Sequence, residues 1–495
     1  MTGHYLALDQ GGGSSRALLF TRDGELVASH AMPIRTIHTD EGHIEHDPEE
    51  VVESLRQAID HACRQLPAGS CIDAAGLATQ RSSMVCWHRQ TGHALSPVIS
   101  WQDRRNADWL KGLEAHAAAI RTRTGLVMTP HYGASKMRWC LDHLPAVRDA
   151  QATGDLVMGP LASFLTCRLL DQRPLLADPC NAARTQLWDL ATQDWSPELL
   201  DLFGIDINVL PDSVGNRFTF GTLPTPAGPV PFTVLTGDQS AVPFAYGPLD
   251  PGRASLNLGT GAFALRAVSG ALPDAPRLLV SLLWSAGSDR CYALEGTVNG
   301  AGSALHWLAE REGLPPAELL RLADKVAAAP VESGHAVPSI PVFLNGVSGV
   351  GSPYWMSQLP SRFIPADGTT PGTRTLAVLE SIAFLLQVNL GEMAPHTVPL
   401  HSMLVTGGLS ANRYLMRCLA TLCGVAVSRA DDPEATARGL ARLIAGPEAR
   451  GWPTNVPESM RLTEIPGLVA RFLRFRTLMN HETDGRSARK TLLDG

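Results

Sequence analysis

The 495-residue sequence lacks the features that mark several protein classes. Its nine cysteines are an odd number without any C-x-x-C pair, which predicts a reduced, cytoplasmic protein rather than a disulfide-stapled secreted one. The N-terminus MTGHYLALDQGGG has no basic segment followed by a long apolar run, so no signal peptide is expected. No apolar run approaches the roughly 18 residues of a membrane span, so we expect no membrane insertion.

Lysine is also scarce: the chain has only four, so most of its 41 cationic residues are arginines. The formal net charge of −7 argues against a nucleic-acid partner. Hydrophobic residues make up 44% and charged residues 18%, an ordinary balance for a globular enzyme and wrong for a disordered chain. The length predicts two or three domains.

Both common nucleotide-binding fingerprints are missing. The sequence has no G-K-[ST], and the early stretch LALDQGGGSSRALLF (6–20) lacks the third glycine of G-x-G-x-x-G. An apolar, strand-like run follows its glycines, whereas both fingerprints lead into a helix. A glycine hairpin still binds phosphate when successive backbone N–H groups turn inward.

The same design occurs a second time, about half the chain later. ASLNLGTGAFALRA (254–267) places Asn257 where the first copy has Asp9, and Gly259-Thr260-Gly261 where the first has Gly11-Gly12-Gly13. An ancient duplication and a chance match between two glycine-rich hairpins both explain this repeat.

Short apolar runs alternate with helical patterns along the chain. DPEEVVESLRQAIDHACRQL is typical of a helix, CIDAAGLATQ of a strand, and HSMLVTGGLSANRYLMRCLATLCG of a strand, a Gly-Gly turn and a long helix. Such alternation predicts α/β layering.

Several polar residues lie where these strands end. In TGDQSA, Asp238 follows a strand, which suits acid–base chemistry at a cleft and equally suits a capping role for the next helix. Two further strand-and-loop segments bring together aromatic, amide and charged side chains: Gln80, Arg81, Trp101, Gln102, Asp103 and Arg104. A tryptophan ring that stacks on C–H groups, beside arginine and glutamine side chains that donate to hydroxyls, suits a small polyhydroxy ligand. A buried tryptophan surrounded by surface ions would give the same sequence pattern. His43 and His46 have H-x-x-H spacing, but no third metal ligand follows at a recognisable distance.

Taken in order, these segments resemble the FGGY family of carbohydrate kinases, and within it the members that phosphorylate glycerol. The resemblance runs from about residue 5 to about 445 and rests on ALDQGGGSSRALLF, EHDP, TQRSS, SWQDRR, HYGASKMRWCL, DPCNAARTQLWD, TGDQSAV, NLGTGAFAL, ALEGTVNGAGSALHWL, VSGVGSPYW, LESIAF and VTGGLSANRYLM. It implies an α/β fold of two ribonuclease-H-like (actin-like ATPase) domains that close on a cleft, with domains at 1–243 and 244–495.

The resemblance also implies site residues. ATP and Mg²⁺ are the implied cofactors, with Mg²⁺ held through water by Asp9 and Asp238. The implied ATP-binding residues are Gly11, Gly12, Gly13, Ser14, Arg16, Thr260, Gly261, Gly302, His306, Gly407, Gly408 and Asn412. Asp238 matches the catalytic base, and the implied polyol pocket comprises Arg81, Ser82, Trp101, Tyr132, Asp238, Gln239 and Phe263. The implied partners are ATP and a small polyol or sugar, and the oligomeric state stays open, a homodimer included.

The chain departs from the family pattern at several positions. Ser82 stands where a glycerol-binding glutamate is usual, Gly12 and Gly13 replace two threonines, and Thr406 replaces an acid. The expected function is transfer of the ATP γ-phosphate to a terminal hydroxyl of glycerol or a similar polyol. The alternatives are a kinase for another small polyol or ketose (erythritol, dihydroxyacetone or a pentulose) and a non-catalytic sugar sensor on the same fold.

Overall fold

In the computed structural model, which describes residues 2–328 and 339–493, both glycine turns lie at the tips of antiparallel hairpins. β1 (Thr2–Gln10) pairs with β2 (Ser14–Thr21), and β16 (Arg253–Leu258) pairs with β17 (Ala262–Ser269). Each turn is closed by the N–H of its first glycine, which donates over 2.9 Å to the carbonyl of Ser14 or of Gly261. The sequence prediction of two strand–turn–strand units is therefore confirmed.

Each hairpin belongs to a six-stranded sheet, and five strands of each sheet share a topology. The sixth strand, β14 or β18, is added antiparallel at opposite edges of the two sheets. The first has the order β14-β15-β6-β1-β2-β3 and the second β18-β19-β17-β16-β22-β23. In both, three antiparallel strands are followed by two parallel ones. The other strands are β3 (Leu26–Pro33), β6 (Ser70–Thr79), β14 (Arg217–Leu223), β15 (Val230–Gly237), β18 (Leu279–Ala286), β19 (Asp289–Val298), β22 (Ser402–Thr406) and β23 (Ala426–Arg429).

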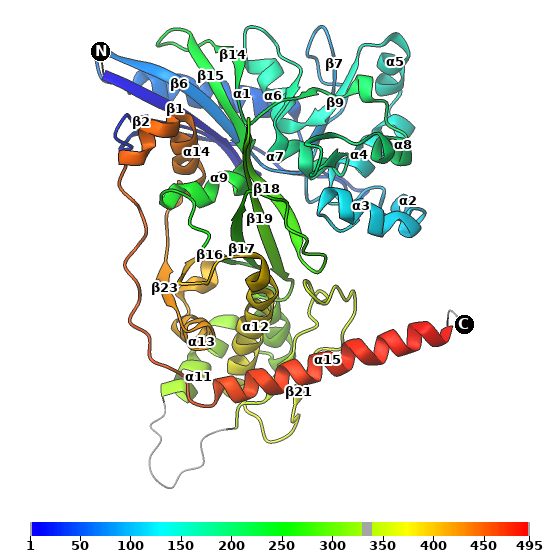
Figure 1. Cartoon of the computed structure of the whole chain (residues 1–495), viewed down its shortest axis with the longest axis vertical. Coiled ribbons are helices and arrows are strands. Elements are labelled where there is room, and N and C mark those ends of the chain that lie inside the picture. The colour runs from blue at the N-terminus through cyan, green and yellow to red at the C-terminus, as the bar shows by residue number, and fades with distance from the viewer. Residues whose placement is uncertain (1, 329–338, 494–495) are drawn as a thin grey trace.

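This repeated topology decides between the two explanations of the sequence repeat. A chance match of two hairpins does not account for agreement in the order and direction of five strands, so the structure favours duplication. The α/β class and the ribonuclease-H-like arrangement of both halves are confirmed. Figure 1 shows the two halves one above the other, with β18 and β19 running between them.

The first long helix illustrates how local sequence sets an element. α1 (Pro48–Arg64) begins where the Asp47 carboxylate accepts the N–H groups of Glu49 and Glu50, with Pro48 in the first turn. Its apolar residues recur at helical spacing and are buried beneath the first sheet: Val51, Val52, Leu55, Ala58, Ile59 and Ala62.

A smaller layer is built from the connection between β3 and α1 and from the chain between β6 and β15. Its five-stranded sheet has the order β4-β5-β8-β7-β9. Its strands are β4 (Ile37–His38), β5 (Ile44–His46), β7 (Met84–His88), β8 (Val98–Ile99) and β9 (Leu156–Pro160), and its helices include α2 (Ala107–Lys111), α4 (Gly133–His143) and the short α7 (Pro179–Ala182). This layer occupies the upper right of Figure 1 and supplies three loops of the site described below.

The core helix of the second half corrects one sequence prediction. α12 (Pro371–Met393) starts at a Thr370–Thr373 capping box and, with the turn that follows, forms a helical segment Pro371–His396 that is long and apolar enough to cross a membrane. Of its apolar window, 78% is buried in the protein, against α11 (Pro316–Ala328), α13 (Arg413–Cys423), β17 and β19. The apolar run is therefore longer than expected, and it serves the core.

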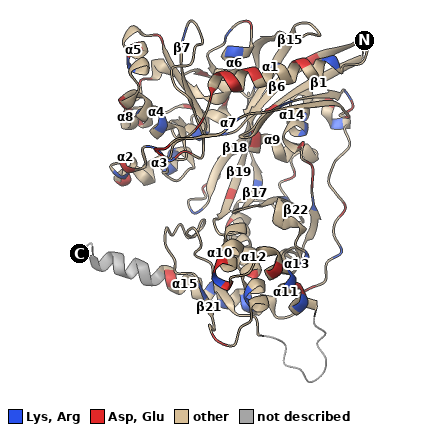
Figure 2. Cartoon of the chain, turned by 180° about the vertical axis from the view of Figure 1, so that it is seen from behind, with Lys and Arg blue, Asp and Glu red and all other residues tan. Residues whose placement is uncertain are grey.

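The chain returns to the first sheet near its end. α14 (Ala435–Ala445) packs on β1, β6 and on α9 (Asp238–Ala241), with Leu440 and Ile444 in the same apolar cluster as Tyr5 and Ala7. Gly439 permits this approach, because a Cβ there would lie 2.0 Å from the Ala241 carbonyl oxygen. Figure 1 shows α14 beside β1 and β2, and Figure 2 shows charges of both signs spread over both halves.

Candidate active site

Two carboxylates converge at one edge of the first sheet. Asp9 lies near the end of β1 and Asp238 directly follows β15, and both strands run parallel to β6 between them, so their carboxyl ends open on the same side. Burial, the negative charge of Asp238 and that of Glu434 raise the pKa of Asp9 to about 7, while Arg16 opposes the shift. The two carboxylates thus lie within one another's electrostatic field.

Asp238 is not a helix cap. Gly237 is the N-cap of α9, no side chain caps that helix, and the Asp238 Oδ1 accepts the neighbouring N–H of Gln239 at 2.6 Å. Burial raises the pKa of Asp238, whereas Arg81 and Arg184 lower it. The capping alternative of the sequence analysis is therefore replaced by a carboxylate that faces two guanidinium groups.

The first glycine hairpin has free space at its tip. A Cβ added to Gly12 or Gly13 would meet no atom within 4 Å, and neither residue has a positive φ. The glycines are therefore not required by packing. Arg16, opposite Asp9 in the hairpin register, donates to the Pro433 carbonyl at 3.0 Å and to the Glu434 carboxylate at 3.2 Å, which ties this hairpin to the start of α14.

The second hairpin is braced by a helix N-terminus. α10 (Gly302–Glu312) directs its first amides at the turn, where Gly302 N–H donates to the Gly259 carbonyl at 3.0 Å and Ser303 N–H to the Thr260 carbonyl at 3.0 Å. A Cβ on Gly302 would lie 2.9 Å from the Gly259 oxygen, so glycine is needed there. His306 is exposed and bonds the Gly302 carbonyl within the same helix.

The Gly-Gly turn after β22 lies against the same hairpin. Gly407 has a φ of +87°, and a Cβ there would be 2.6 Å from the Leu258 carbonyl oxygen. Asn412 is the N-cap of α13, because its side chain accepts the Leu415 N–H at 2.8 Å. The Thr406 hydroxyl accepts from the Asn257 side chain at 3.0 Å. The residue that replaces the family acid thus meets Asn257, which stands in the second hairpin where the first hairpin has Asp9.

An ion-pair cluster connects Asp238 to the second sheet. The Arg81 Nε lies 4.0 Å from the Asp238 Oδ1, and its Nη1 lies 3.5 Å from the Glu295 carboxylate on β19. Arg184 lies 3.8 Å from the other Glu295 oxygen and donates to Ser281 Oγ at 2.9 Å. Burial opposes ionisation of Glu295, but Arg81 and Arg184 hold its pKa below the usual value.

Aromatic rings form a wall beside this cluster. The His131 ring packs edge-on against Trp101 (5.6 Å between centroids) and against Tyr132 (4.8 Å). Trp101 and Phe263 are 38% and 51% exposed, whereas Tyr132 is 3% exposed beneath the Arg184 guanidinium at 5.1 Å. In this wall the open faces therefore come from Trp101 and the half-buried His131, while Phe263 is exposed on β17 of the second sheet.

Ser82 occupies an unusual backbone position. Its φ is +67°, and its buried hydroxyl has no hydrogen-bond partner within residues 2–328 and 339–493. A buried hydroxyl without a partner is costly and rare. The position reserved for a glutamate in the family pattern thus carries a shorter group whose hydrogen-bonding capacity is unused.

Other sequence candidates do not join the site. Asp103 is fully buried and forms a two-point ion pair with Arg105 at 2.8 Å, which makes it a structural residue. The buried His46 bonds the Arg35 carbonyl at 2.9 Å, and His43 packs edge-on against Trp139. In the described part of the chain no three His, Cys, Asp or Glu side chains group closely enough to hold a metal by themselves.

Sequence reasoning missed three residues of the site: Arg184, Glu295 and His131. A signal existed for Glu295, since YALEGTV places a lone carboxylate inside an otherwise apolar strand. Their pairing with Arg81 and Trp101 is long-range, and a single sequence does not reveal it.

Comparison with known proteins identifies the family. The family model "FGGY family of carbohydrate kinases, N-terminal domain" matches residues 4–250, and its C-terminal counterpart matches residues 254–445. The chain is 35% identical to a glycerol kinase of Alkalilimnicola ehrlichii over 456 residues, covering 89% of each chain. It is 37% identical to a glycerol kinase of Trichlorobacter lovleyi over 452 residues, covering 88% of each.

Solved structures share the fold. A glycerol kinase of Plasmodium falciparum with ADP superposes with a TM-score of 0.85 at 22% identity, covering 97% of this chain and 98% of that one. A xylulose kinase of Rhodospirillum rubrum gives 0.82 at 21% identity, covering 96% and 98%.

Proposed function

This chain belongs to the FGGY family of carbohydrate kinases, and we propose that within it the chain transfers the ATP γ-phosphate to a terminal hydroxyl of glycerol or a glycerol-like polyol. Family membership makes it an ATP-dependent sugar or polyol phosphotransferase. The choice of glycerol is supported by the glycerol kinases with which the chain shares 35–37% identity over most of its length.

The observation that carries the proposal is the position of Asp238. Its carboxylate lies 4.0 Å from the Arg81 guanidinium and close enough to Asp9 to raise the pKa of that carboxyl group. It stands at the sheet edge where the first glycine hairpin turns. A carboxylate in this place is suited to accept the proton of an attacking hydroxyl, and phosphoryl transfer asks the protein mainly for positioning and charge neutralisation. Arg81 orients the acceptor, because its fork of N–H donors suits paired hydroxyls.

The two hairpins suit the phosphates of ATP. Their turn amides provide donors without a lysine, and the N-terminus of α10 behind the second turn adds a positive helix-dipole end. Asp9 and Asp238 fit a Mg²⁺ ion, which prefers one or two carboxylates together with substrate phosphates. Mg²⁺ would neutralise phosphate charge. Burial and then the nearby carboxylates of Asp238 and Glu434 raise the pKa of Asp9, and a cation would relieve the repulsion between these carboxylates.

The nucleotide residues named from the sequence have different local duties. Gly302 and Gly407 are required for close approach to the second hairpin, while Asn412 caps α13. We assign Gly11, Ser14, Thr260, Gly261 and Gly408 to the phosphate and nucleotide side of the site on the resemblance alone. Gln239, next to Asp238 and exposed, stays assigned to the polyol.

A second candidate is favoured by Ser82. Its short side chain and unpartnered hydroxyl leave room and a donor for a longer polyol or a ketose. A screen that couples ADP release to a dye signal, over three- to five-carbon polyols and ketoses, separates the two. Glycerol is expected to give the highest kcat/KM, and a four- or five-carbon compound that ranks far above it would replace glycerol.

The catalytic assignment is tested with Asp238→Asn. Loss of a general base costs about 10²–10⁴ in rate, so turnover should fall at least a hundredfold while ATP binding persists. Asp108→Asn, at an exposed surface pair with Lys111, is the matched control and should keep full turnover. Undiminished turnover in Asp238→Asn would remove that residue from the role of base.

A further inference from the structure

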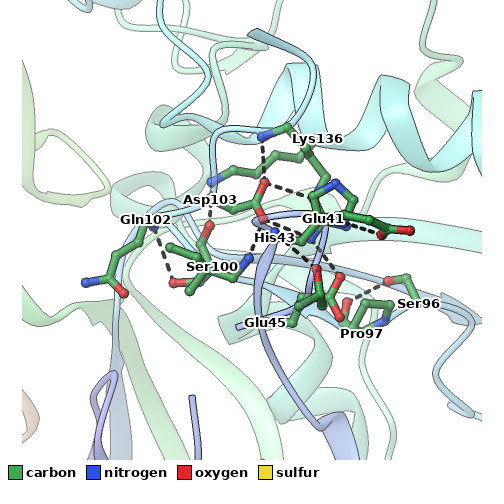
Figure 3. A network of polar contacts seen from close by, with 12 residues as sticks. Glu41, His43, Glu45, Ser96, Pro97, Ser100, Gln102, Asp103 and Lys136 are labelled. Atoms are coloured by element: carbon green, nitrogen blue, oxygen red, sulfur yellow. Dashed lines mark hydrogen bonds and ion pairs between the residues drawn. The ribbon is translucent and has the colours of Figure 1, made fainter. Parts of the chain in front are cut away.

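Lys136, on α4, is one of the four lysines of the chain and is completely buried. Its ammonium donates to three backbone carbonyls: His131 O at 2.7 Å, Ser100 O at 2.8 Å and Ser82 O at 3.3 Å. An ammonium has three N–H donors, so each is used once. Figure 3 shows this lysine above Asp103 and Ser100.

The three carbonyls come from three different loops of the candidate polyol pocket. Ser82 follows Arg81 after β6, Ser100 precedes Trp101 after β8, and His131 lies between Trp101 and Tyr132 before α4. Each carbonyl belongs to a residue that is itself in the pocket or directly adjacent to one that is. One side chain therefore joins the backbone of all three loops.

Within the described residues, no carboxylate accepts a hydrogen bond from the Lys136 ammonium. The negative charge of Asp103 favours the ammonium, but both Asp103 oxygens are occupied by the Ile44 N–H at 2.7 Å and by Arg105. Within the described residues, Lys136 forms no ion pair. Burial lowers the pKa of Lys136 to about 7, so the cost of burying the ammonium is offset only in part by its three hydrogen bonds to backbone carbonyls.

We propose that Lys136 is a positioning residue that clamps the Arg81–Ser82, Ser100–Trp101 and His131–Tyr132 loops into one preformed polyol pocket. The proposal rests on the proposed function, since it takes these loops to be the acceptor site. A second contact, from the Trp101 N–H to Ser83 Oγ at 3.0 Å, still joins two of the loops when the lysine is removed. Loss of the clamp should therefore loosen the pocket without detaching its parts.

The test compares Lys136→Met with Lys111→Met, the same substitution at an exposed lysine on α2. Hydrogen–deuterium exchange is followed at residues 80–84, 99–103 and 130–134, with α1 as the reference segment. We expect exchange to accelerate at least tenfold in all three loops of Lys136→Met, with α1 unchanged and no change in Lys111→Met. Acceleration in one loop alone, in none, or equally in α1 would overturn the clamp.

Kinetics supply a readout that a general packing role would not move. In Lys136→Met the KM for the best polyol should rise at least tenfold, while the KM for ATP changes less than twofold. Equal losses for both substrates would overturn the proposal. If the wild-type protein phosphorylates no polyol or ketose, the proposed function fails, and the exchange result still decides the clamp.

The wild-type protein offers a measurement that needs no variant. Exchange of the three loops is followed at rising, sub-denaturing urea. Loops joined by one ammonium should open as a unit, with one common free energy of opening and one urea dependence. Three separate urea dependences would overturn the clamp even if Lys136→Met does not fold.

Discussion

Arg81 and Glu295 come from the two different halves of the molecule, and their charged groups meet at 3.5 Å beside the candidate base Asp238. Arg81 follows β6 of the first sheet, and Glu295 lies on β19 of the second. Both side chains are about one-tenth exposed, so their attraction is weakly screened by solvent. The position of Arg81, which we propose binds the acceptor, is therefore set in part by the other half.

Glu295→Gln should consequently weaken polyol phosphorylation. Arg81 and Arg184 would lose their shared counter-charge, and removing one partner of a buried pair costs about 3–5 kcal/mol of unfolding free energy. We expect kcat/KM for the polyol to fall by about ten- to a hundredfold. This range corresponds to the roughly 1.5–3 kcal/mol that an interaction with a charged group contributes. Steady-state kinetics and urea unfolding measure both effects.

The matched control is Glu198→Gln, because Glu198 forms an exposed pair with Arg123 at 3.0 Å. Exposed pairs contribute little, so kinetics and stability should stay near the wild type. If Glu295→Gln also keeps wild-type kcat/KM, Glu295 has no part in holding Arg81.

The tip of the first hairpin has room for the hydroxyls that the family pattern places there. Since a Cβ on Gly12 meets no atom within 4 Å and the backbone is not left-handed, Gly12→Thr should be accepted without strain. An added hydroxyl donor to phosphate is worth about 1 kcal/mol, or about fivefold in kcat/KM for ATP. Gly12→Val has the same shape without the hydroxyl, and an equal gain in that variant would refute the hydrogen-bond explanation.

Ser82 is expected to control the choice of acceptor. Ser82→Glu places a carboxylate where the serine hydroxyl has no partner, so kcat/KM for glycerol should rise by about tenfold and that for erythritol should fall. Competition between the two polyols for the same enzyme measures the ratio. A ratio that does not move would show that Ser82 lies outside the specificity-determining part of the pocket.

Local patterns made much of this structure predictable. A glycine turn between two apolar runs is a short-range signal, and it predicted both hairpins. Helical spacing of apolar residues predicted α1, and an apolar run predicted the strand before Asp238. The apolar length of α12 was underestimated, because polar residues such as Glu380 interrupt the run in sequence. That carboxylate is buried and paired with Arg471 at 2.6 Å.

Long-range pairing was not predictable in the same way. Nothing near Glu295 in the chain indicates that it meets Arg81 and Arg184, and the return of α14 to the first sheet depends on Gly439 fitting against Ala241. The family resemblance named Tyr132 as a pocket residue but not its neighbour His131. In the structure the Tyr132 ring lies beneath Arg184, and the His131 ring packs beside Trp101. Such outcomes are set by tertiary contacts.

His131 gives the pH prediction. Burial and the nearby cations Arg184, Lys136, Arg81 and Arg104 hold its pKa well below the ordinary value of 6.5, so the imidazole stays neutral in the folded protein at pH 7. As the pH falls below 6.5, the unfolded chain binds a proton on this histidine and the folded chain does not. Protonation then favours unfolding, by at most about 1.4 kcal/mol for each pH unit.

Wild-type protein should therefore lose more unfolding free energy than His131→Asn when the pH is lowered from 7 to 5. The measurement is urea unfolding of both proteins at several pH values, with His116→Asn, at an exposed histidine, as the control that follows the wild type. If the stability difference between wild type and His131→Asn is flat from pH 7 to 5, the folded protein protonates His131 as readily as the unfolded chain does.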